Sequence, residues 1–185
     1  MHIHNGFTLI ELLIAIAVAA IVLSLGVPSF ERVIERNQIT ANTNKFVSTL
    51  NLARSEAIKR NQRVKICDST DGATCGAGSY EQGWMVFVDD NDDGVLDSPD
   101  EQLIQVYEAL PAVFTVNPNL TLGANDVSYQ ANGRANRGGN FILCKLNDTT
   151  KAKVIILDVN GRARVTAYAP DGTPFDASGT PITNC

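Results

Sequence analysis

The stretch of the sequence whose side chains could bind a metal ion is the acidic segment 89–101. Counted from its first residue, it has the spacing of a calcium-binding EF-hand loop, with a glycine at the sixth position. The predicted ligands, the valine through its backbone carbonyl, are Asp89, Asn91, Asp93, Val95, Asp97 and Asp100. An EF-hand loop carries a bidentate Glu at position twelve, where this segment has Asp100, and follows a helix, where a strand is expected here. Calcium is the one cofactor that the sequence suggests, and a solvated acidic turn is the alternative.

Two arginines near the C-terminal end could recognise phosphate groups. Arg162 and Arg164 are two residues apart on an expected strand, so their side chains project from the same face. A guanidinium can donate two parallel hydrogen bonds to phosphate oxygens, which suits arginine to the nucleic acid backbone. Other basic residues of the same stretch could extend this surface: Arg134, Arg137, Lys145, Lys151 and Lys153. The alternative is a hairpin whose arginines serve solubility and pair with Asp158.

The charges are distributed unevenly along the chain. The net charge is −5, but residues 66–133 contain twelve acidic and no basic side chains, whereas residues 134–168 contain seven basic and two acidic ones. This asymmetry predicts an acidic lobe and a basic lobe. Any affinity for nucleic acid must therefore come from a local patch.

The four cysteines indicate two disulfides in an oxidising compartment. They are Cys67, Cys75, Cys144 and Cys185, which leaves three pairings open. Because the segment 67–75 spans an Asp-Gly turn, we favour Cys67–Cys75 and, by elimination, Cys144–Cys185. A zinc site is the rival interpretation, but the sequence has no Cys-x-x-Cys and no neighbouring histidine to support it.

The first element that must position these residues is an apolar run that begins at Gly6-Phe7-Thr8-Leu9-Ile10-Glu11. About 20 apolar residues at ~1.5 Å rise cover the ~30 Å hydrocarbon core of a bilayer, so residues 7–29 predict a transmembrane helix. Glu11 is the one charge in this run. A carboxylate there costs on the order of 3 kcal/mol and marks a candidate functional residue. A cleaved export signal and a plain anchor are the alternatives, but neither explains the spacing of Gly, Phe and Glu.

The second element is an amphipathic continuation of the helix over residues 30–61, and the third is a β-rich head over residues 62–185. Apolar residues recur at helical spacing at Phe46, Leu50, Ala53 and Ala57. Beyond residue 61 the apolar period changes to two, and strands are expected at 63–67, 84–88, 103–107, 114–116, 127–129, 141–146, 154–159 and 164–169. Asn160-Gly161 predicts a hairpin with a type I′ turn.

The segment Gly6–Glu11 resembles the class III leader of type IV pilins and type II secretion pseudopilins. The resemblance implies that residues 1–6 are a leader, that prepilin peptidase cuts between Gly6 and Phe7, and that Phe7 is then methylated. It also implies that Glu11 pairs with the new amine of a neighbouring subunit as the helix leaves the inner membrane for a filament. His2 and His4 would be lost with the leader, which leaves no histidine. Since the sequence also has no nucleophile–base pair and no phosphate-binding glycine loop, we do not expect an enzyme.

Three further segments narrow the resemblance: Ala53-Arg54-Ser55-Glu56-Ala57, then Trp84 with Phe87 and Asp89, then Gly161-Arg162-Ala163-Arg164. Together they are similar to the GspH/FimT family of minor pilins and minor pseudopilins. The resemblance implies an α+β type IV pilin fold, in which a long N-terminal helix carries a head of two antiparallel β-sheets.

The family resemblance also carries a functional expectation. In FimT-like minor pilins the Gly-Arg-x-Arg element is associated with DNA binding in natural transformation. We therefore expect a minor type IV pilin that binds DNA without sequence specificity and assembles with other major and minor pilins. It would lie in the inner membrane with a single span and a periplasmic head before entering a pilus or pseudopilus. The alternatives are a type II secretion minor pseudopilin H and a minor pilin that primes assembly without binding DNA.

Overall fold

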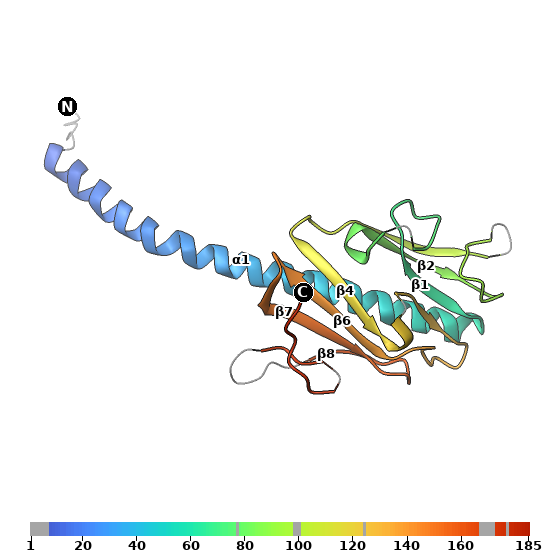
Figure 1. The fold of residues 1–185 in the computed structure, drawn as a ribbon. Helices are drawn as coiled ribbons and strands as arrows, with labels where there is room; N and C mark the ends of the chain where they lie inside the picture. Colours follow the sequence, from blue (N-terminus) through green and yellow to red (C-terminus); the bar gives the residue numbers. More distant parts are fainter. Residues whose placement is uncertain (1–7, 77, 98–100, 124, 167–172, 177) are drawn as a thin grey trace, which may run out of the picture. The chain divides into compact units, whose positions relative to one another are not determined.

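The computed structural model describes residues 8–76, 78–97, 101–123, 125–166, 173–176 and 178–185. One long helix, α1 (Leu9–Arg60), precedes eight strands (Figure 1). The strands are β1 (Val64–Asp68), β2 (Gly83–Val88), β3 (Leu103–Glu108), β4 (Phe114–Leu120), β5 (Val127–Tyr129), β6 (Gly139–Lys145), β7 (Asp148–Leu157) and β8 (Ala163–Val165). Two short 3₁₀ helices, η1 (Tyr80–Gln82) and η2 (Thr121–Gly123), precede β2 and β5. Every predicted strand has a counterpart, although β7 begins six residues before its predicted start.

The chain divides into two compact units, residues 1–38 and residues 39–185. In the first unit, α1 exposes large apolar side chains along its length, among them Leu9, Ile10, Leu13, Ile21, Leu23 and Phe30. None of the helices in the described part of the chain meets the length and apolarity expected of a membrane span. The transmembrane segment predicted at residues 7–29 therefore stays a prediction.

In the second unit, the C-terminal half of α1 is the centre of the core. Phe46, Leu50, Ala53 and Ala57 are buried, as their helical spacing predicts. Asn61 ends the helix in the left-handed conformation, with φ 56°. The N–H groups of residues 61 and 62 donate to the carbonyls of residues 58 and 57, which satisfies the last turn of the helix.

Two four-stranded antiparallel sheets pack against this half of α1 (Figure 1). The first sheet has the strand order β3-β2-β1-β5, and the second has the order β4-β6-β7-β8. Phe46 joins the three layers, because its ring lies 5.4 Å from that of Trp84 in β2 and 4.7 Å from that of Phe141 in β6. This architecture confirms the predicted α+β pilin fold.

The outer face of each sheet carries one disulfide, in the pairing that the sequence favoured. Cys67–Cys75 closes the loop after β1, and Cys144–Cys185 ties the C-terminal tail to β6. The tail also packs Ile182 against the apolar residues Ile142, Val154 and Ile156 of the outer face. Both confirmed disulfides therefore hold irregular segments against a sheet.

The turn types differ from the prediction. Asn160 does not have positive φ, so the turn at Asn160-Gly161 is not type I′. Instead, the Gly161 N–H donates to the Asp158 carbonyl, and the Asp158 N–H donates to the carbonyl of residue 162. This pattern is a type I turn followed by a left-handed glycine, which forms a bulge. The type I′ turn of this head lies at Leu146-Asn147, where φ is 54° and 56°.

Candidate functional site

The predicted processing site lies at the start of the described chain. Gly6 and Phe7 fall outside the described residues, whereas Glu11 is in the first turn of α1. Its Oε2 accepts hydrogen bonds from the backbone N–H and the hydroxyl of Thr8, both at 3.0 Å, and its own N–H donates to the Thr8 hydroxyl at 3.3 Å. Thr8 and Glu11 therefore form a capping box, in which both side chains satisfy backbone groups of the helix end. The spacing Thr-x-x-Glu is the signal that could have revealed this second role of Glu11.

In the described part of the acidic segment, residues 89–97 and 101, several side chains bind the backbone of the same segment. The Glu101 carboxylate is nearly buried and accepts from the N–H groups of Asp90, at 2.8 Å, and Asp97, at 3.1 Å. Asn91 accepts from the N–H of Asp93, and its amide donates to the carboxylates of Asp93 and Asp97. The Asp93 carboxylate in turn accepts from the N–H of residue 95. These bonds fix the loop by the short side-chain-to-backbone contacts typical of Asx turns.

The first predicted ligand, Asp89, is turned towards a lysine. Its carboxylate is fully buried, with Oδ2 3.8 Å from Lys65 Nζ and Oδ1 accepting from the Gly94 N–H at 3.4 Å. Burial raises the pKa of Asp89 above its usual value, and the neighbouring Lys65 partly offsets this shift. Within the described ranges, no three His, Cys, Asp or Glu side chains come together closely enough to hold a metal ion. Asp100 lies outside those ranges, and calcium binding stays a prediction.

The lysines predicted to extend the arginine surface lie elsewhere on the head. Arg164 is opposite Ile156, whose side chain is on the outer face of the sheet. Lys151 and Lys153 are an odd number of residues from Ile156 along β7, so their side chains lie on the opposite face of the sheet. Lys153 is also about 13 Å from the end of the strand at Leu157. Lys145 is at the other end of the hairpin, beside the turn at 146–147. These three lysines therefore lie apart from the arginines along the β6–β7 hairpin, and their contact with DNA stays a prediction.

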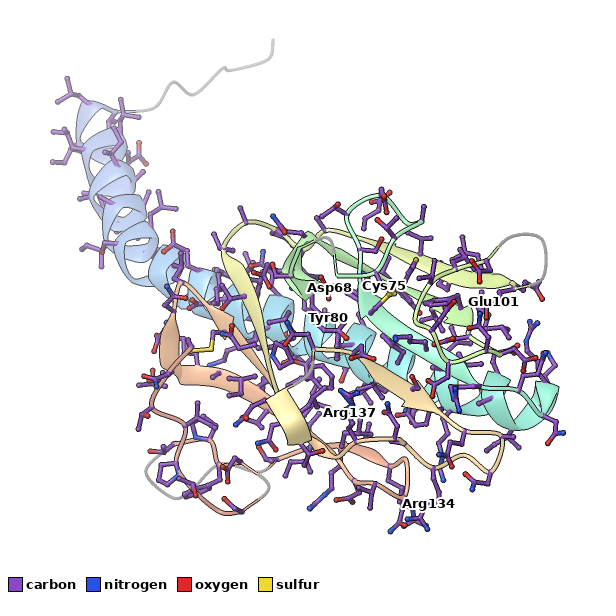
Figure 2. All side chains as sticks on the ribbon, turned by 45° about the vertical axis from the view of Figure 1, so that its right-hand side comes forward. Asp68, Cys75, Tyr80, Glu101, Arg134 and Arg137 are labelled. Atoms are coloured by element: carbon purple, nitrogen blue, oxygen red, sulfur yellow. A yellow bond between two sulfur atoms is a disulfide. The ribbon has the colours of Figure 1, made fainter. Side chains whose placement is uncertain are left out.

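Arg137 is engaged within the head. Its Nη1 lies 3.5 Å from Asp126 Oδ1, and Lys65 Nζ lies 3.1 Å from the other oxygen of the same carboxylate. Lys65 continues this chain of charges to Asp89. In Figure 2 the Arg134 side chain points outwards at the edge of the head. Arg137 therefore belongs to a partly exposed charge network of the head.

The repeated tetrapeptide Asn-Gly-Arg-Ala, at 132–135 and 160–163, forms the same turn twice. In the first copy the Gly133 N–H donates to the Gln130 carbonyl, and the Gln130 N–H donates to the Arg134 carbonyl. This repeats the pattern of the second copy, and the two glycines have φ 77° and 78°. Each turn presents the arginine that follows its glycine to solvent, Arg134 in one and Arg162 in the other.

The two turns pack against each other and against α1. The Ala135 N–H donates to the Val159 carbonyl at 3.2 Å. Arg54, on the buried side of α1, donates from Nε to the Gly133 carbonyl at 3.0 Å and from Nη2 to the Asn160 carbonyl at 3.2 Å. The sequence placed Arg54 in a family motif but gave it no role. No sequence signal connects Arg54 with these turns, because it lies 79 positions before Gly133.

The three arginines of this end form the candidate site, which we call the arginine edge: Arg134, Arg162 and Arg164. All three are exposed. In the part of the chain that the structure describes, no carboxylate forms an ion pair with any of them, including the Asp158 considered from the sequence. Glu101 in the acidic loop lies at a different edge of the head from Arg134 (Figure 2). The arginine edge is therefore a cationic surface whose donors are available to a ligand.

Comparisons with known proteins agree with this architecture. Residues 1–27 match the prokaryotic N-terminal methylation motif. Among solved structures, the head and helix are similar to the type IV minor pilin FimU of Pseudomonas aeruginosa, with 19% identity, a TM-score of 0.56, and coverage of 82% of this chain and 97% of that one. They are also similar to the minor pseudopilin EpsH of the Vibrio cholerae type 2 secretion system, with 14% identity, a TM-score of 0.50, and coverage of 70% and 97%. At these identities the likeness shows the fold. No curated protein sequence matches the chain.

The family model described as type II transport protein GspH matches residues 42–161, which is more than half of the chain. The methylation motif implies processing by prepilin peptidase and assembly with other pilins, and the family implies a membrane-anchored subunit that then enters a filament. The pilin fold, the methylation motif and this match together show that the chain belongs to the GspH family of minor pilins and pseudopilins.

Proposed function

We propose that the protein is a minor pilin, a filament subunit without catalytic activity, whose head binds DNA through the arginine edge. Its N-terminal helix would hold it in the inner membrane by a single span, with the head in the periplasm, until the subunit enters the pilus. The observation that carries the proposal is the packing of the turn that carries Arg134 against the turn that carries Arg162, with Arg164 two residues further along the chain. All three arginines are exposed and without a carboxylate partner among the described residues.

The physical argument rests on local charge. The whole chain is acidic, with a net charge of −5, so long-range attraction does not bring it to DNA. Phosphate contacts supply most of non-specific DNA binding, because each one releases condensed counterions. Arginine suits this contact, since its planar fork can donate to two phosphate oxygens and stays charged at any physiological pH. An arginine already held by a carboxylate would lose part of this capacity, and no carboxylate of the described residues holds the edge arginines in that way.

The fold also offers a matched control. The pair Lys151 and Lys153 carries the same charge as the pair Arg162 and Arg164 and comes from the same hairpin. The lysine pair, however, lies on the other face of the sheet and towards its other end. Removing either pair changes the net charge equally, so a difference between the two double variants reports position rather than total charge.

The test is fluorescence anisotropy with labelled duplexes of unrelated sequence, titrated with the full chain in detergent over a range of salt concentrations. We expect binding at roughly micromolar Kd or weaker, as for non-specific binders. The Arg162→Ala/Arg164→Ala variant should weaken binding to all duplexes alike and reduce the salt slope by up to about 2 units, at about 0.9 per phosphate. The Lys151→Ala/Lys153→Ala variant should change the slope much less. Equal effects of the two variants, or no binding by the parent, would refute the proposal.

The second candidate function is a type II secretion minor pseudopilin, which the match to the GspH family model favours. The two functions separate in the cell. Deleting the gene should abolish DNA uptake and leave protein secretion intact if the pilus function is right, and should abolish secretion if the pseudopilin function is right. If the protein only primes pilus assembly and does not bind DNA, deleting its gene should reduce piliation. The arginine variants should then restore piliation in the deletion strain as well as the parent does.

A further inference from the structure

The two Asn-Gly-Arg turns come from distant parts of the sequence, yet they touch through their backbones. A Cβ atom built on Gly161 would lie 2.0 Å from the Gly133 carbonyl oxygen, and one built on Gly133 would lie 2.7 Å from the Ile58 side chain. Both glycines also have φ near 78°, a conformation that favours glycine. The missing side chain of Gly161 therefore allows the two turns to meet, and that of Gly133 allows the first turn to approach Ile58 of α1.

Arg54, on α1, connects the two turns from the side of the helix. Its guanidinium donates to one carbonyl of each turn, Nε to Gly133 and Nη2 to Asn160, at 3.0 and 3.2 Å. Two different nitrogens of one rigid plane make these bonds, so the separation of the two carbonyls is fixed by the geometry of the guanidinium. A lysine ammonium at this position would be a single point of charge and would lack that planar fork.

The position of Arg54 excludes a direct role in contacting a ligand through the same donors. Its side chain is half-buried, and its Nε and the ring of the buried Tyr129 both lie 3.1 Å from the Cβ position of Gly161. Its Nε and Nη2 are already bound to backbone carbonyls. By contrast, the arginines that follow the two glycines are exposed. Arg54 is placed to act on a ligand only through the turns that it holds.

We propose that Arg54 is a positioning residue that joins the two Asn-Gly-Arg turns into one surface, so that Arg134 and Arg162 contact the same DNA backbone together. This inference rests on the proposed DNA binding. It adds that the spacing of the edge arginines, and not only their number, determines how many phosphates are engaged at once. It also explains why the chain carries the same tetrapeptide twice.

The test compares Arg54→Lys with a matched control, Arg60→Lys, in the full chain in detergent. Both substitutions keep the charge and lie on α1, but Arg60 pairs with Glu56, at 2.6 Å, and does not touch the turns. The first measurement is hydrogen exchange of the Ala135 amide, whose acceptor is the Val159 carbonyl of the other turn. The second is the salt slope of DNA binding.

In Arg54→Lys we expect faster exchange at Ala135, and a salt slope shallower by about 1 unit, equivalent to the loss of one phosphate contact. Arg60→Lys should leave both at the parental values. Adding Arg134→Ala to Arg54→Lys should then have little further effect on the slope, because the two turns no longer act together.

Two results would overturn the proposal, and they are distinguishable from a failure of DNA binding itself. Faster exchange at Ala135 with an unchanged salt slope would make Arg54 a purely structural residue. Unchanged exchange would show that Arg54 does not hold the turns together. If the parent does not bind DNA at any salt concentration, the proposed function fails. In that case faster exchange in Arg54→Lys would leave Arg54 with a structural role alone.

Discussion

The substitution Gly161→Ala tests the close contact between the two Asn-Gly-Arg turns. The new methyl group would overlap the Gly133 carbonyl oxygen, 2.0 Å away, so the turns must separate. Separation breaks the bond from Arg54 to Asn160 and the bond from Ala135 to Val159. A hydrogen bond from a charged donor contributes about 1.5–3 kcal/mol and a backbone bond about 1 kcal/mol. The left-handed conformation of an alanine costs about 1–2 kcal/mol more. Since these hydrogen-bond values are already net of exchange with water, we expect the free energy of unfolding to fall by about 3.5–6 kcal/mol.

Gly179→Ala is the control for this substitution. Gly179 has φ 83°, but no atom lies within 4 Å of the position of its Cβ. This variant therefore reports the conformational cost alone, about 1–2 kcal/mol. The assay is urea unfolding followed by the fluorescence of Trp84, the single tryptophan, which is fully buried. If the two variants lose the same stability, the contact between the turns does not contribute to the stability of the head, and the reasoning is wrong.

Three further predictions follow from the remaining candidate sites. Glu11→Gln should be cleaved and methylated normally, as judged by intact mass, and should keep the capping box with Thr8, because Gln can take the same role. It should nevertheless fail to assemble, as Glu11→Ala does, since it cannot form an ion pair with a neighbour's amine. Normal assembly of the Gln variant would show that Glu11 serves assembly through the helix cap. The hydrogen bonds within residues 89–97 favour the solvated turn, so we expect the same melting temperature in millimolar calcium and in chelator. A higher melting temperature in calcium that Asp93→Ala abolishes would instead establish the calcium site, because a ligand of the native state stabilises it. Because burial raises the pKa of Asp89, the native state binds a proton there more tightly than the unfolded state, and ionisation of this carboxylate lowers stability as pH rises above about 4. Asp89→Asn should therefore gain stability relative to the parent as pH increases from 4 to 7. A stability difference that does not vary with pH would refute the raised pKa of Asp89.

The sequence alone determined the architecture of this protein. The apolar spacing of α1 named the residues that the head buries, because a helix places every third or fourth side chain on one face. The alternation of polar and apolar residues located β1, whereas a continuous apolar run located β2, which is buried on both faces of its sheet. The pairing Cys67–Cys75 also followed from the sequence, since a short loop with a turn brings its ends together.

The turn types could not be read in the same way. Asn-Gly favours a type I′ turn in a two-residue hairpin, but the loop between β7 and β8 is longer and uses its glycine as a bulge. The type I′ turn at Leu146-Asn147 contains no glycine that would predict it from sequence. The pairing of Lys145 with Asp148 leaves two residues for this turn, and both have positive φ. The helix cap at Thr8 and Glu11 was readable but is easily overlooked beside the processing motif.

The candidate site depended on the tertiary structure. Proximity in sequence grouped Lys145, Lys151 and Lys153 with the arginines, but a strand of ten residues carries its two ends about 30 Å apart and alternates its faces. Conversely, Arg54 lies 79 positions before Gly133, and no local pattern connects them. Sequence fixes which side chains share a face of one element, because that follows from the period of the backbone. Which elements meet follows from packing of the whole core, and only that packing brings Arg54 and the two turns into contact.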